Sequence, residues 1–174
     1  MESSDSNIFP SASIVLDMVK KEYDNELKRS TNLDSKVNIT LTLCAALLAI
    51  EYQQVDVHSL LVKQIHTISD CIIPIICIIS IILSLCLLIF ATFCFIHVIS
   101  VHNYTRPEYM DFLDTEVYKK DVQETIIAVT TYYSNAIISN RDITDLRMKK
   151  YQKAIYCVLL AVIFLTLANI LKGN

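Results

Sequence analysis

The segment from Cys71 to Thr105 constrains this chain most, because it contains no aspartate, glutamate, lysine or arginine. Its first part, Cys71 to Ile96, is apolar apart from hydroxyls and thiols. An α-helix rises about 1.5 Å per residue, so this part is longer than the roughly 30 Å hydrocarbon core of a bilayer. A helix that is apolar on every side has no face to present to water. The chain is therefore predicted to be a membrane protein.

Composition favours a fold made of helices. Hydrophobic residues make up 53% of the 174 residues, while glycine occurs once and proline three times, so residues that break helices are nearly absent. The net charge of −3 argues against nucleic acid as a partner. The six cysteines lie in or beside apolar stretches without C-x-x-C spacing. We therefore expect no metal site, no disulfide and no cofactor.

The order of apolar and charged stretches predicts an all-α integral membrane protein with three transmembrane helices, an N-terminal amphipathic helix and a long cytoplasmic helical region. The predicted segments are a flexible N-terminus at 1–12, a juxtamembrane amphipathic helix at 13–36, a first span at 37–52, an outer connector at 53–70, a second span at 71–101, a cytoplasmic helical region at 102–153 and a third span at 154–172.

Three details of these segments follow from length and residue type. The first span is short for a bilayer. Local thinning of the bilayer would accommodate it, or the helix would extend past Lys36 and Glu51 with both side chains reaching the interface. Pro74 is expected in the first turn of the second span. The charged region before the third span predicts one long helix or two in close succession.

Basic residues predict the topology. All but Lys63 and Lys172 of the 15 lysines and arginines lie before the first span or between the second and third. Because basic residues concentrate on the cytoplasmic side, we expect the N-terminus and the 102–153 region to be cytoplasmic and the C-terminus to lie outside.

The sequence contains no nucleophile elbow, glycine-rich phosphate loop or metal-spaced cluster, so we expect that the protein is not an enzyme. An integral-membrane enzyme would need a clustered polar pocket. The predicted topology places His58 and His66 on the opposite side of the membrane from His97.

Polar and small residues share one face of each predicted span. The first carries Asn38, Thr42, Ala45 and Ala49, the second Ser80 and Ser84, and the third Ala154, Ala161 and Ala168. Small residues let helices approach closely, and hydroxyls and amides in hydrocarbon need partners. Two interpretations stay open: packing within a three-helix bundle, or the lining of a pore in a homo-oligomer. Arg147 and Lys150, in the basic stretch before the third span, suit an anionic ligand or the anionic headgroups of the bilayer.

Two local patterns resemble a known family. In RSTNLDSKVNITLTLCAALLAI, Asp34 and Lys36 form an acid-x-Lys element before a short span. In YYSNAIISNRDITDLRMKKYQKAIYCVLLAVIFL, Asn135 and Asn140 precede a basic stretch, Lys153 and the last span. This layout resembles the small transmembrane effectors of Pycsar-type bacterial antiphage defence and, more loosely, the SLATT membrane modules of nucleotide-signalling defence systems. It covers roughly residues 13–172.

The resemblance implies a bacterial inner-membrane effector that responds to a cyclic nucleotide made by a partner cyclase, oligomerises or opens, and permeabilises or depolarises the membrane. The alternative is a non-conducting membrane anchor or adaptor that recruits a partner protein through its cytoplasmic helices. The chain departs from the family pattern at Val37, where a small residue is expected, and at Cys44, Ala45 and Ala154, where glycines are usual. The candidates for receiving the ligand or signal are Asp34, Lys36, Asn140, Arg147 and Lys150.

Overall fold

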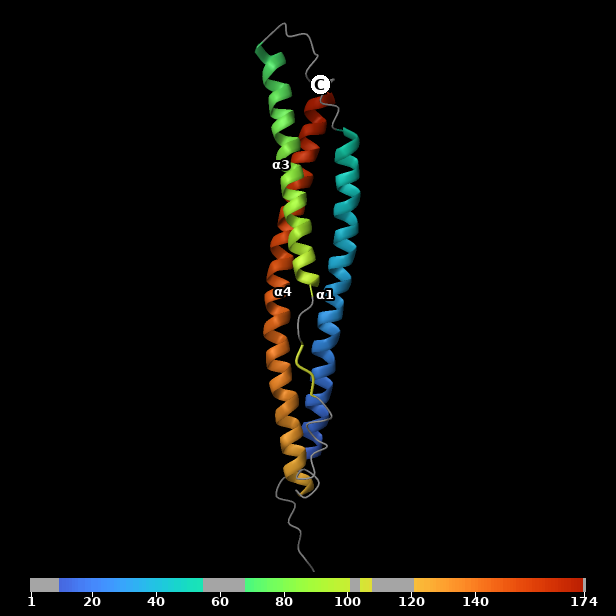
Figure 1. The fold of residues 1–174 in the computed structure, drawn as a ribbon, viewed down its shortest axis with the longest axis vertical. Coiled ribbons are helices and arrows are strands. Elements are labelled where there is room, and N and C mark those ends of the chain that lie inside the picture. Colours follow the sequence, from blue (N-terminus) through green and yellow to red (C-terminus); the bar gives the residue numbers. More distant parts are fainter. Residues whose placement is uncertain (1–9, 55–67, 101–103, 108–120, 174) are drawn as a thin grey trace, which may run out of the picture. The chain divides into compact units, whose positions relative to one another are not determined.

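The computed structural model describes residues 10–54, 68–100, 104–107 and 121–173. Within these ranges the regular structure is helical (Figure 1), and the helices are α1 (Ala12–Gln54), α3 (Ile68–Ile99) and α4 (Val122–Gly173). Each helix is long and apolar enough to cross a membrane. These helices confirm the predicted all-α, three-helix membrane fold. Residues 1–9 of the predicted flexible N-terminus, most of the outer connector and part of the region before α4 lie outside the described residues.

The start and the continuity of α4 follow from local sequence. The backbone N–H of Gln123 donates to the Asp121 side chain at 3.3 Å, so Asp121 caps the helix. From there α4 runs without interruption to Gly173, so the stretch after Val122 and the third span form one long helix.

The start of α3 differs from expectation. The helix begins at Ile68, so Pro74 lies inside it and not in its first turn. Proline has no N–H, so it removes one helical hydrogen bond at this point. The apolar run that begins at Cys71 identifies the span but not the first residue of the helix, because helical structure extends into the neighbouring residues.

The chain divides into two compact units, and α1 and α4 contribute residues to both. The first unit comprises Met1–Asn32 and Val101–Leu146, and the second comprises Leu33–Ser100 and Arg147–Asn174. The second unit contains all of α3 and the apolar parts of the other two helices. We therefore describe it as the membrane unit and the other as the polar unit.

Small residues bring α3 and α4 together in the membrane unit. Ala154, Ala161 and Ala168, which recur at every seventh position of α4, are all buried. Ser84 of α3 donates its hydroxyl hydrogen to the carbonyl oxygen of Ala161 at 2.9 Å, and the Cys77 thiol donates to that of Ala168 at 3.5 Å. Such side-chain-to-backbone bonds require close helices, which the alanines permit.

The third helix of the membrane unit, α1, contributes Leu33, Val37 and Cys44 to the same core. The Tyr151 hydroxyl lies 3.3 Å from that of Thr40, which links α4 to α1. The α1 helix runs past both Lys36 and Glu51, but only Lys36 is exposed, whereas Glu51 is buried with 2% of its surface accessible. Of the two ways to accommodate a short first span, the one in which the Glu51 side chain reaches the interface does not hold, because this side chain lies inside the packed unit.

The polar unit has a small core of its own between α1 and α4. Tyr23, Ala136 and Ile137 are buried there. The rings of Tyr23 and Tyr133 pack edge to face, with centroids 5.4 Å apart, a geometry worth about 0.5–1.5 kcal/mol. Burial raises the pKa of the Tyr23 phenol above its ordinary value. With only these buried residues in the described part of the chain, the core is small, so polar contacts form much of the interface between α1 and α4 in this unit.

Replacement of Ala161 by leucine tests the α3–α4 packing. The larger side chain has no room beside Ser84, so we expect a loss of about 1–3 kcal/mol in unfolding free energy. Thr166→Leu is the matched control, because Thr166 is exposed on the same helix. Unfolding in detergent micelles followed by circular dichroism measures the difference. Equal stability of the two variants would contradict close packing at Ala161.

Candidate functional site

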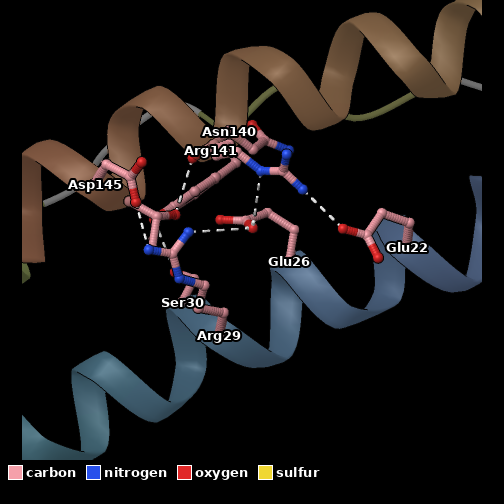
Figure 2. Close-up of polar contacts among 9 residues, drawn as sticks. Glu22, Glu26, Arg29, Ser30, Asn140, Arg141 and Asp145 are labelled. Carbon is pink, nitrogen blue, oxygen red and sulfur yellow. Dashed lines mark hydrogen bonds and ion pairs between the residues drawn. The ribbon is translucent and has the colours of Figure 1, made fainter.

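Charged side chains of α1 and α4 face each other in the polar unit, as Figure 2 shows. We call this set the α1–α4 network. Glu22, Glu26 and Arg29 come from α1, and Arg141 and Asp145 come from α4.

The network is built around two guanidinium groups. Arg141 donates to Glu22 Oε1 at 2.7 Å and lies 4.0 Å from Glu26 Oε2. Arg29 lies 3.6 Å from Glu26 Oε2 and donates to Asp145. The hydrogen bond to Asp145 raises the pKa of the Arg29 guanidinium. Most of these side chains are close to half exposed, so solvent screens each pair and each contributes less than about 1 kcal/mol.

Glu26 is the exception, because only 5% of its surface is accessible. Its Oε1 has no hydrogen-bond partner among the described residues. The three carboxylates of the network also outnumber its two guanidinium groups, which leaves it with a negative charge. This charge disfavours an anionic ligand at the network itself.

Asn140, a predicted ligand residue, makes a structural contact. Its Oδ1 accepts from the Thr105 backbone N–H at 2.9 Å, and its Nδ2 donates to the Thr105 carbonyl at 3.0 Å. On the other side, the Ser30 hydroxyl donates to the Tyr104 hydroxyl at 2.8 Å. The segment 104–107 is thus fixed to both α1 and α4, and the Asn140 amide is engaged by the chain itself.

Two other predicted residues, Asp34 and Arg147, meet in the membrane unit. The Arg147 side chain, 4% exposed, forms an ion pair with Asp34 and donates from Nε to the Val98 carbonyl at 2.9 Å. One guanidinium therefore connects α4 to both α1 and α3. The Asp34 side chain is 41% exposed, so it lies at the edge of the unit.

The remaining predicted ligand residues, Lys36 and Lys150, belong to neither the Asn140 contact nor the Asp34–Arg147 ion pair. Lys36 is exposed on α1. Lys150 borders a hollow of about 270 Å³ between α3 and α4, which we call the basic hollow. Its lining consists of Phe90, Phe93, Cys94, His97, Lys150 and Lys153. Two ammonium groups beside aromatic rings suit an anion that carries a planar or apolar group.

The structure separates the four polar span residues into two pairs. Ser80 and Ser84 are buried, and their hydroxyls donate to the carbonyls of Ile76 and Ala161. Asn38 and Thr42 are exposed on α1, where the Thr42 hydroxyl donates to the Asn38 carbonyl at 3.0 Å. The serines therefore pack the unit internally, whereas Asn38 and Thr42 face away from it.

Sequence reasoning did not find the α1–α4 network, although a signal was present. Glu22, Glu26 and Arg29 recur at helical spacing on α1, as do Arg141 and Asp145 on α4. Opposite charges at such spacing on two helices indicate faces that pair. In the part of the chain that the structure describes, no three histidine, cysteine or acidic side chains gather to hold a metal ion.

The family model described as the Pycsar effector protein domain matches residues 18–172 of the chain. The match extends over both units and includes every candidate residue named above. No curated protein and no solved structure matches the chain.

The Asp34–Arg147 ion pair is expected to matter more for stability than the Arg29–Asp145 pair. Asp34→Asn leaves a buried guanidinium without its carboxylate, and we expect a loss of about 2 kcal/mol. Asp145→Asn removes a carboxylate from a half-exposed pair, and we expect less than about 1 kcal/mol. Unfolding of both variants in the same micelles compares them. A larger loss for Asp145→Asn would show that Arg147 does not hold the three helices together.

Proposed function

The chain belongs to the Pycsar effector protein family, as its sequence predicted, and from this membership we propose that it permeabilises or depolarises the bacterial inner membrane. The family and the three apolar helices make it a membrane effector of antiphage defence. The finer steps of the proposal are a cyclic nucleotide made by a partner cyclase as the signal, and a homo-oligomer as the form that opens. The positive-inside pattern supports a cytoplasmic N-terminus and an outside C-terminus.

The observation that carries the proposal is the outward position of Asn38 and Thr42 on the membrane unit. An amide facing hydrocarbon lacks hydrogen-bond partners. Among the described residues, no hydrogen bond joins the Asn38 side chain to another group. A second copy of α1, or water enclosed by several copies, would supply one. Ala45 and Ala49 continue the same face and would allow α1 helices to approach closely.

The basic hollow supports the step that receives the signal. A cyclic nucleotide combines an anionic phosphodiester with a planar base. Lys150 and Lys153 offer positive charge for the former, and Phe90 and Phe93 offer apolar rings for the latter. Both lysines lie on α4, which has no glycine before Gly173. A displacement of α4 at the hollow would therefore reach its apolar part instead of being absorbed at a flexible residue.

The alternative, a non-conducting anchor or adaptor, draws support from the α1–α4 network. Charged groups such as Glu22 and Arg141 are close to half exposed there and are available to a partner protein. The two proposals differ in what the outward face of α1 does. An anchor does not need Asn38 and Thr42, whereas an oligomeric pore does.

Leakage from liposomes distinguishes the two proposals. We expect purified protein to release an enclosed dye when a cyclic nucleotide is added, and the double variant Asn38→Leu, Thr42→Val to lose this release. Ile39→Leu is the control, since Ile39 is exposed on the same helix but apolar. Absence of release by the unmodified protein would favour the anchor, and full release by the double variant would show that the leak does not depend on the outward face of α1.

Calorimetry with a panel of cyclic nucleoside monophosphates tests the basic hollow. Lys150→Ala removes one charged donor, worth about 1.5–3 kcal/mol, so we expect binding to weaken about tenfold or more. Lys149→Ala is the matched control, because it removes the same charge from an exposed neighbour that does not line the hollow. Equal affinity of both variants would place the ligand elsewhere.

A further inference from the structure

Glu51 is a carboxylate inside the membrane unit that the proposed function does not yet use. It is buried, with 2% of its surface accessible, and neither of its carboxylate oxygens has a hydrogen-bond partner among the described residues. It borders a hollow of about 510 Å³ that is otherwise lined by Leu48, Tyr52, Ile81 and Leu85.

The neighbours of Glu51 place it at hydrocarbon depth. Ile81 and Leu85 lie near the middle of the apolar span Ile72–Ile99 of α3. At about 1.5 Å per residue, roughly 13 Å of apolar helix lies between Ile81 and Ile72, and roughly 21 Å between Leu85 and Ile99. Glu51 is therefore far from either end of this span.

The groups around Glu51 do not neutralise it. The Ser84 hydroxyl faces the carboxylate, but it donates its hydrogen to the carbonyl oxygen of Ala161 on α4. Tyr52, from α1, is the only other titratable side chain among the described residues that line the hollow. An ionised carboxylate without a partner is very unfavourable in hydrocarbon, so the group must hold a proton or a cation.

We propose that Glu51 and the hollow beside it form a cation site within the membrane, occupied by a proton in the resting protein and by an alkali cation when the protein is open. On opening, water enters the hollow, the carboxylic acid releases its proton to that water, and the two carboxylate oxygens bind the incoming cation. This inference rests on the proposed permeabilisation and deepens it, because it makes the leak selective for cations.

Infrared spectroscopy tests the resting site without any need for conductance. In lipid nanodiscs near neutral pH and without nucleotide, we expect a carbonyl band of a protonated carboxyl group that Glu51→Gln lacks. Glu22→Gln, which changes an exposed acid, should leave the band unchanged, and Glu51→Asp should shift it but keep it. Absence of the band from the unmodified protein would mean that Glu51 is ionised at rest and would overturn the inference.

Bilayer recordings across a potassium chloride gradient test the open site. We expect the reversal potential of the unmodified protein to lie near that of potassium, to move to near zero in Glu51→Gln, and to stay near potassium in Glu51→Asp. A reversal potential that is the same in the unmodified protein and in Glu51→Gln would overturn the cation site. Absence of any current would instead overturn the proposed permeabilisation, while the infrared band would still decide whether Glu51 holds a proton.

Discussion

Hydrocarbon offers no hydrogen-bond partner to a polar group, and the arrangement of the membrane unit depends on this constraint. Hydroxyl groups on its helices, such as those of Thr40, Ser80 and Thr92, donate to carbonyl oxygens one turn earlier in the same helix. Ser84 and Cys77 instead donate to carbonyl oxygens of α4, which draws two helices together. Two of these polar side chains thus become packing contacts between helices, whereas the others are satisfied within their own helix.

The same constraint makes the exceptions informative. The Arg147 guanidinium is satisfied inside the unit, since it binds Asp34 and the carbonyl of Val98 and so connects three helices. Asn38 and Glu51 do not meet the constraint within the described part of the chain. One faces outward and the other inward, so they require different partners: a second copy of the chain or enclosed water for Asn38, and a proton or cation for Glu51. An effector that assembles and then conducts would use both.

The sequence predicted what depends on composition and period. The absence of charge in the α3 span predicted a helix that crosses the membrane. The seven-residue spacing of Ala154, Ala161 and Ala168 predicted close approach of helices, but left open whether the neighbouring helix belongs to the same chain. The sequence alone does not predict contacts between residues that lie far apart along the chain. The sequence patterns indicate Asp34 and Arg147 as two separate ligand candidates, and only the fold brings these residues together. The sequence alone leaves open whether the Glu51 side chain reaches the interface, because its position in an apolar run does not reveal that α3 extends well beyond it.

In the proposed mechanism, further copies of the same chain cover the outward face of α1. Native mass spectrometry of the protein released from lipid nanodiscs measures this directly. The proposed mechanism requires a defined species at a multiple of the 19.8 kDa chain mass, and Asn38→Leu should shift it towards the single-chain mass. A single-chain mass for the unmodified protein, with and without a cyclic nucleotide, would contradict it.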